Sequence, residues 1–257
     1  MVRGLYTSAL GMTTQMKKMD VVTNNIANAA TSGFKKDVVV TQTFTDELMS
    51  RLNDPDKILS PKAPKVGNLA MGLAVDNVFT DFTTGTLRLT SGDLDIALNG
   101  SGFIAVSTTD ANGNVTEKYT RDGSLTLTGN GTLVTGDGNP IVGENGIIQI
   151  PNGMITINHD GSVYSGETFV DRIRLVDFEN KESLRKYGDS LYEITQETVE
   201  IPFSGTVIQG SLEDSNVNTV REMVDMITLS RNYETNQRAI TAINETLARA
   251  VNDLGRK

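Results

Sequence analysis

The residues of this sequence that could perform chemistry are few. The single histidine, His159, could be a general base or a metal ligand. It lies in the segment 158–161, however, where asparagine, aspartate and glycine are typical of a turn. No Gly-x-Ser-x-Gly segment accompanies it and the chain has no cysteine, so neither a serine nor a thiolate nucleophile is indicated. We interpret His159 as a turn residue.

Two carboxylates have a spacing that could serve glycoside hydrolysis. In a strand over residues 93–98, side chains alternate with period two, so Asp93 and Asp95 would lie on one face. The same alternation is typical of an amphipathic strand with a solvated polar face. We favour this second interpretation, in which the inward residues are Leu94, Ile96 and Leu98.

Three other segments partly resemble ligand-binding loops. Residues 110–114 begin like a calcium loop, but Val115 and Arg121 stand where an EF-hand needs glycine and an acid. The glycines in 129–131 and 136–138 are not followed by the Lys and Ser or Thr of a phosphate-binding loop. The sequence therefore predicts no catalytic residue, no cofactor site and no metal site.

The charge and hydropathy of the chain limit the kinds of partner that it can bind. The formal net charge is -9 at pH 7, and most of the negative charge lies in the middle of the chain, which is a poor surface for nucleic acid. No apolar run approaches the roughly 18 residues of a membrane span or forms the centre of a cleavable signal. We expect neither nucleic-acid binding nor direct membrane insertion. The N-terminal basic residues, which we interpret as the solvated face of a helix, are Arg3, Lys17, Lys18, Lys35 and Lys36.

The elements that position these residues are two long helices around a β region. The pattern predicts a first helix over 5–30, ended by Gly33 in a left-handed conformation, and a last helix from Ser215 or Asn216 to residue 254. Residues 79–202 have the short alternating segments and Asn-Gly pairs of a sandwich, barrel or roll. The Asn-Gly pairs lie at 99–100, 112–113, 145–146 and 152–153.

The predicted fold is mixed α and β, with long terminal helices that pair as a coiled-coil-like domain and flank a glycine-rich all-β body. Residues 1–36 and 211–257 would form the helical terminal assembly domain, and 79–210 the β-rich body. The linker or extended region 37–78 begins with a β-branched run at 38–41 and continues with a helical turn over 46–52. A loop over 53–67 follows, with Pro55, Pro61 and Pro64.

Both terminal helices carry a heptad pattern, with apolar or small residues at alternating steps of four and three. In the first helix these residues are Leu5, Ala9, Met12, Met16, Met19, Thr23 and Ile26. In the last they are Val220, Met223, Met226, Leu229, Tyr233, Ile240, Ile243, Leu247, Val251 and Leu254. Isolated helices with one narrow apolar stripe are marginal in water. We therefore expect both ends to order when neighbouring molecules cover their stripes.

Five blocks of sequence, in order, resemble the bacterial flagellar axial proteins, which are the rod and hook subunits of the basal body. The first block is NNIANAATSGFKK at 24–36, directly after the first heptad helix, and the second is LTSGDLDIALNGSGFIAV at 89–106. The others span 119–142, 172–195 and 212–240. The chain is too short for the large outer domains of a hook protein, so the resemblance favours a rod subunit. The long unmatched linker favours the distal type.

The resemblance implies a structural subunit that polymerises into an axial drive-shaft and export channel, required for motility. The implied partners are copies of the chain, other rod and hook proteins and basal-body ring proteins. Type III export without a cleaved signal peptide would deliver it to the flagellar basal body. The alternative is a secreted β-rich enzyme or adhesin that acts on polysaccharide. The candidate assembly-interface residues are Leu5, Met12, Met16, Met19, Asn24, Asn25, Ile26, Asn28, Thr31, Met226, Tyr233, Ile240 and Leu247.

Overall fold

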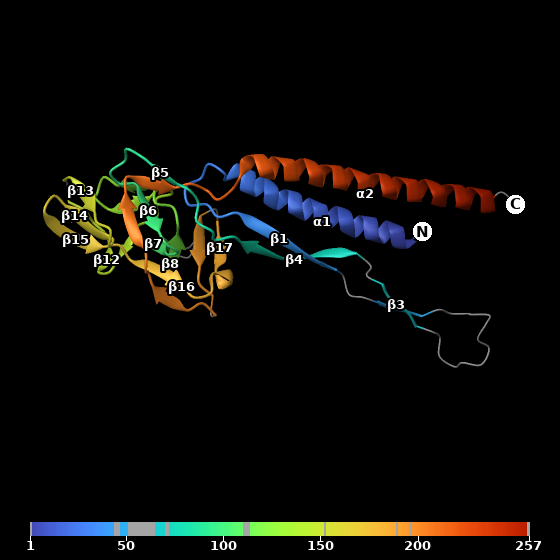
Figure 1. Ribbon diagram of the computed structural model, residues 1–257, viewed down its shortest axis with the longest axis horizontal. Helices are drawn as coiled ribbons and strands as arrows, with labels where there is room; N and C mark the ends of the chain where they lie inside the picture. Colours follow the sequence, from blue (N-terminus) through green and yellow to red (C-terminus); the bar gives the residue numbers. More distant parts are fainter. Residues whose placement is uncertain are drawn as a thin grey trace. The chain divides into compact units, whose positions relative to one another are not determined.

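The computed structural model describes residues 2–43, 47–50, 65–69, 72–109, 114–151, 153–188, 190–195 and 197–255. It consists of a mainly β region and two helices, as the sequence predicts (Figure 1). The chain divides into two compact units. The terminal-helix unit comprises Met1–Asn24, Asp37–Phe79 and Val220–Lys257, and the β body comprises Asn25–Lys36 and Thr80–Thr219.

The two helices are α1, Val2–Ala27, and α2, Thr219–Leu254. Within the terminal-helix unit they run antiparallel, because Gly4 of α1 lies against Ile243 and Gly11 lies against Asn236. A Cβ atom added to Gly11 would lie 2.9 Å from Asn236 Nδ2, so glycine allows α2 a close approach. These two glycines are seven residues apart and therefore share one side of α1.

A short β ribbon packs on a different side of α1. Strand β1, Asp37–Thr43, pairs with β4, Leu73–Thr80, and β2, Glu47–Ser50, pairs with β3, Lys65–Leu69. The Thr14 hydroxyl donates to the Leu73 carbonyl oxygen at 3.1 Å, which connects α1 to the ribbon.

Three sequence-based predictions need correction. Helix α1 ends at Ala27 rather than residue 30, so Gly33, with φ of 69°, lies in the following turn and is not the helix terminus. Helix α2 begins at Thr219, after Ser215 and Asn216 make loop contacts. The helical turn predicted over 46–52 is wrong at Glu47–Ser50, which is a strand. The proline-containing loop lies outside the described residues.

The β body contains one larger sheet and several small antiparallel pairs. The six-stranded sheet has the order β17-β18-β8-β7-β16-β19. Its strands are β7, Phe103–Thr109; β8, Val115–Thr120; β16, Leu175–Phe178; β17, Arg185–Tyr187; β18, Leu191–Glu193; and β19, Glu200–Pro202. A 3₁₀ turn, Lys181–Ser183, precedes β17.

The remaining strands of the β body form pairs and one three-stranded sheet, β13-β14-β15. Strand β5, Leu87–Leu89, pairs with β21, Ser211–Glu213, and β6, Ile96–Asn99, pairs with β20, Thr206–Gln209. The others are β9, Leu125–Leu127; β10, Leu133–Thr135; β11, Val142–Gly143; β12, Gly146–Ile147; β13, Ile155–Ile157; β14, Ser162–Ser165; and β15, Thr168–Arg172.

Two clusters of side chains form the core of the β body. An aliphatic cluster includes Ile104, Leu133 and Ile141, which are fully buried. An aromatic cluster centres on Phe103, whose ring lies 5.5 Å from those of Phe178 and Tyr192. Aromatic and β-branched residues on paired strands provide this kind of stabilisation.

Two predictions for the β region can be compared with the described strands. The strand expected over 93–98 begins only at Ile96, because Asp93 and Leu94 form a turn. The Asn-Gly pair at 145–146 lies at the hairpin between β11 and β12, as expected. Asn112, Gly113 and Asn152 lie outside the described residues.

Candidate functional site

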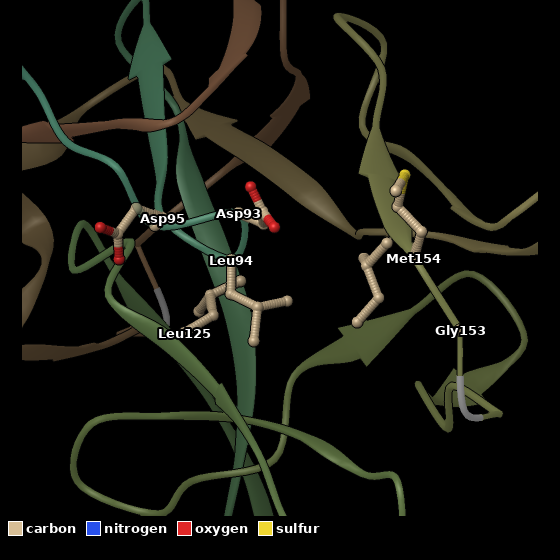
Figure 2. Close-up of a pocket in the computed structure, with 8 residues that line it drawn as sticks. Asp93, Leu94, Asp95, Leu125, Gly153 and Met154 are labelled. Atoms are coloured by element: carbon tan, nitrogen blue, oxygen red, sulfur yellow. The ribbon is translucent and has the colours of Figure 1, made fainter.

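Asp93 and Asp95 do not form a pair of facing carboxylates. They line a pocket of about 440 Å³ together with Gly92, Leu94, Leu125, Gly153, Met154 and Ile155. Figure 2 shows the two carboxylates pointing away from one another. The Asp95 carboxylate accepts a hydrogen bond from the Thr90 hydroxyl at 2.6 Å, within its own loop. The arrangement that glycoside hydrolysis would need is therefore not formed by these residues.

His159 is a turn residue, as the sequence predicts. Its ring Nδ1 lies 2.9 Å from the Val207 carbonyl oxygen, and the Val207 N–H donates to the His159 carbonyl oxygen at 2.9 Å. Among the described residues, no group of three or more His, Asp or Glu side chains could hold a metal ion. In the same residues, neither helix combines the length and apolar character that would let it cross a membrane.

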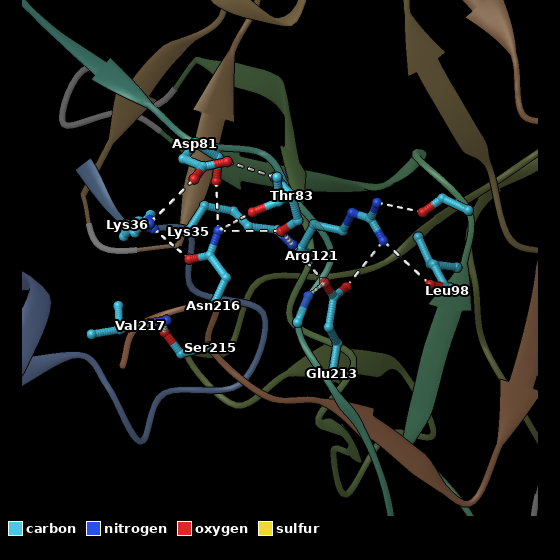
Figure 3. Close-up of polar contacts among 12 residues, drawn as sticks. Lys35, Lys36, Asp81, Thr83, Leu98, Arg121, Glu213, Ser215, Asn216 and Val217 are labelled. Atoms are coloured by element: carbon cyan, nitrogen blue, oxygen red, sulfur yellow. Dashed lines mark hydrogen bonds and ion pairs between the residues drawn. The ribbon is translucent and has the colours of Figure 1, made fainter. Parts of the chain in front are cut away.

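The most unusual polar arrangement is a buried ion cluster formed by Lys35, Arg121 and Glu213 (Figure 3). Lys35 Nζ donates to Glu213 Oε1, and Arg121 Nη1 donates to Glu213 Oε2 at 3.0 Å. These charged side chains are at most 2% exposed. Lys35 also donates to the Thr83 carbonyl oxygen at 2.8 Å, and Arg121 to backbone carbonyl oxygens at Leu98 and Gly100.

The electrostatics of the cluster follow from its burial. Burial lowers the pKa of Lys35, although the Glu213 carboxylate opposes that change. Burial likewise lowers the pKa of Arg121, against the attraction of Glu213. Each cation is held mainly by one carboxylate, and removal of a single partner from such a group leaves an uncompensated buried charge.

A second set of contacts lies beside the ion cluster and centres on Asn216. Its side-chain oxygen accepts from the Lys36 N–H at 2.8 Å, and its side-chain nitrogen donates to the Asp81 carbonyl oxygen at 2.8 Å. The Gly33 N–H donates to the Glu213 carbonyl oxygen at 2.8 Å. The β body thus joins two segments far apart in sequence, the one that follows α1 and the one that precedes α2.

Sequence reasoning missed the buried ion cluster. The interpretation of Lys35 as part of a solvated helix face is wrong, because the residue lies beyond α1 and is fully buried. Lys35 and Glu213 are 178 positions apart, and no periodic pattern connects them. The only signal was indirect, since Gly33 and Asn216 fall in the two blocks that resemble the axial proteins.

The candidate assembly residues of α1 lie in different environments. Met16 is 49% exposed, whereas Leu5, Met12, Met19 and Ile26 are half-buried. The side of α1 that faces α2 includes Gly4 and Gly11, which the apolar pattern did not identify. In the segment around the helix end, Asn24 is exposed, Asn25 is buried, and the Thr31 hydroxyl donates to the Asn28 side chain at 3.3 Å.

The candidate residues of α2 share one stripe. Met226, Tyr233, Ile240 and Leu247 are half-buried at heptad spacing. The stripe is narrow, because most other positions of α2 are exposed. Of the predicted seam, Val220, Met223 and Val251 are exposed, and the Leu254 side chain lies outside the described residues.

Three family models match successive parts of the chain. They are described as Flagella basal body rod protein over residues 5–35, Flagellar hook protein FlgE/F/G D1 domain over 97–165, and Flagellar basal body rod FlgEFG protein C-terminal over 208–254. The first and last of these models cover the ends of the chain, where the two helices lie.

Curated relatives match nearly the whole chain. The flagellar basal-body rod protein FlgG of Buchnera aphidicola is 35% identical over 96% of this chain and 98% of its own length. The flagellar basal-body rod protein FlgF of Caulobacter vibrioides is 35% identical over 100% of this chain and 99% of its own length. FlgG of Bacillus subtilis is 32% identical over 98% of this chain and 99% of its own length.

Proposed function

The chain belongs to the flagellar basal-body rod protein family and is a structural subunit of the bacterial flagellar basal body, and we propose that it polymerises with copies of itself through its terminal helices. In this proposal the two helices pair in a coiled-coil-like manner and, with their neighbours, surround an axial channel. The role is structural rather than catalytic.

The observation that carries the proposal is the lack of a core in the terminal-helix unit. Among the residues of this unit whose side chains the structure describes, Thr14 alone is fully buried and no apolar side chain reaches that state. All the fully buried apolar side chains of the described chain belong to the β body. A helical unit without a buried apolar core has little to offset the loss of chain entropy on folding.

The length of α2 supports the same proposal. Its 36 residues correspond to about 54 Å at 1.5 Å per residue. Gly4 of α1 lies opposite Ile243, so the last part of α2 continues past the start of α1. Neighbouring subunits would cover the exposed apolar residues of both helices, and the helices would become fully ordered only in the polymer.

The proposal includes partners and a route of delivery. Other rod and hook proteins would adjoin the subunit along the axis, and ring proteins of the basal body would surround it. Export would proceed through the flagellar type III system without cleavage of a signal peptide. The distal position within the rod remains our preferred assignment.

Two measurements on the purified full-length chain test the proposal. Electron microscopy of concentrated protein should show tubes or short rods, and hydrogen exchange of dilute protein should show rapid exchange in both helices with protection in the β body. Leu247→Asp is the comparison variant, because it places a charge in the half-buried stripe of α2. Concentrated protein that stays monomeric, with both helices protected when dilute, would contradict the proposal.

A further inference from the structure

Helix α2 carries a second apolar surface, which we call the helix patch, formed by Val220, Met223, Val224 and Ile227. All four side chains are more than half exposed. Their spacing places them on one side of α2, about 120° around the helix from Met226 and Tyr233 and about 160° from Asn236 and Ile243, which lie against α1. The helix patch therefore faces away from α1.

The β ribbon carries a matching surface, the ribbon face, formed by Val38, Val40 and Val78. All three are exposed. The Gln42 side chain donates to the Asp76 carboxylate at 2.7 Å, which places these two residues on the same side of the ribbon. Because strand side chains alternate with period two, Val38 and Val40 share the side of Gln42, and Val78 shares that of Asp76.

Helix α1 lies between α2 and the strands β1 and β4 in the terminal-helix unit (Figure 1). It contacts α2 through Gly4 and Gly11, and it contacts β4 through the hydrogen bond from Thr14 to Leu73. The helix patch and the ribbon face both remain exposed, so neither covers the other within one molecule. A pair of strands with an uncovered apolar face is marginal in water and needs a packing partner.

We propose that the helix patch of one molecule packs on the ribbon face of the next copy of the chain. This proposal rests on the polymerisation proposed above and specifies one of its interfaces. The two surfaces have complementary charges: Arg231 follows Ile227 by one turn on the same side of α2, and Asp76 lies two residues before Val78. The spacings of the apolar side chains also match: residues four apart on the helix are separated by about 6 Å, and residues two apart on the strand by about 7 Å.

The geometry of this contact explains continued growth. The two surfaces are different parts of the molecule, so the contact is heterologous. Each added copy buries one helix patch and one ribbon face and leaves one of each exposed at the ends of the assembly. Such contacts produce open-ended helical assemblies rather than closed dimers.

Disulfide cross-linking tests the contact directly, because the chain has no cysteine of its own. The variant with both Val40→Cys and Ile227→Cys, oxidised at a concentration where the wild type assembles, should form a ladder of covalent oligomers. Each single-cysteine variant should give no covalent oligomer under the same oxidation. The matched control pairs Val40→Cys with Asn232→Cys, which is exposed on a different side of α2, and should give no ladder.

Charge reversal provides a second, independent test. Asp76→Arg and Arg231→Asp should each raise the concentration needed for assembly roughly tenfold, and the double variant should recover most of that loss. Assembly without a Val40–Ile227 ladder, or a covalent dimer from either single cysteine, would overturn this contact and leave the polymerisation proposal intact. A chain that never assembles at any concentration would overturn both.

Discussion

Glu213 Oε2 accepts a hydrogen bond from Arg121 Nη1 at 3.0 Å, while its other oxygen accepts from Lys35 and from the Gly85 N–H. One buried carboxylate therefore connects the segment after α1, the sheet and the segment before α2. This arrangement leads to several expectations about stability.

Glu213→Ala should destabilise the β body by about 3–5 kcal/mol, because it leaves two buried cations without their anion. Urea unfolding of the full-length chain, followed by tyrosine fluorescence, measures the change. The neighbouring ion pair offers a matched control: Asp214 accepts from Arg88 at 3.0 Å and both side chains are exposed. Asp214→Ala should cost less than about 1 kcal/mol. Equal effects of the two changes would contradict the importance of the cluster.

Gly33→Ala should destabilise the same region. Gly33 has φ of 69°, and an added Cβ would overlap the Arg121 carbonyl group. The unfavourable φ alone costs about 1–3 kcal/mol for a residue with a side chain. Gly129→Ala is the control, since an added Cβ there meets no atom within 4 Å. A melting temperature for Gly33→Ala equal to that of the control would show that the turn can relax.

Asp122→Asn should stabilise the β body at neutral pH. Burial, with contributions from Asp137 and Asp95, raises the pKa of Asp122 against its hydrogen bonds from Ser124. The folded state thus binds this proton more tightly than the unfolded state, and stability falls as pH rises from the unfolded pKa through the folded one. Asparagine keeps an acceptor without the charge. The advantage over wild type, measured by thermal unfolding, should shrink towards pH 3.

Asp177 should stabilise the folded state with a pH dependence opposite to that of Asp122. Burial acts to raise its pKa, but hydrogen bonds from Ser101, the Phe178 N–H and Lys181 lower it overall. Its contribution is therefore complete above the unfolded-state pKa of about 3.9 and is lost as pH falls through the lower folded value. Asp177→Asn should flatten the acid part of the stability curve, whereas Asp225→Asn, exposed on α2, should leave it unchanged.

Met16→Asp and Leu247→Asp should leave the β body folded but block incorporation into the rod, because each places a charge on a predicted assembly surface. Swimming in soft agar and resistance of the β body to limited proteolysis are the two readouts. Asn232→Asp adds the same charge at an exposed position outside the half-buried stripe of α2, and a strain that carries it should swim normally. Normal swimming by the Leu247 variant would count against the stripe.

The sequence predicted the elements more successfully than the contacts between them. Heptad spacing identified the half-buried side of α2 because its residues, such as Tyr233 and Ile240, are large and apolar. The same search did not identify Gly4 and Gly11 of α1 as contacts with α2, because glycine gives no apolar signal. Where local patterns determine structure, as in α1 and α2, prediction from one sequence was adequate.

Long-range polar contacts were beyond such reasoning. The ion cluster joins Lys35 to Glu213 across 178 positions, and nothing in either local sequence distinguishes a buried lysine from a surface one. At Asp93 and Asp95 the local pattern itself was misleading, because the alternation predicted a strand from residue 93 whereas the chain turns there and the strand begins at Ile96. The candidate assembly residues remain predictions that the variants above can test.

The ion cluster also has a mechanical consequence. Within the β body, Glu213 binds Lys35 of the segment that follows α1 and also binds Arg121, while Glu213 itself lies in the segment that precedes α2. Separation of the two segments would therefore break buried ion pairs as well as backbone hydrogen bonds, although the chain has no cysteine to form a disulfide.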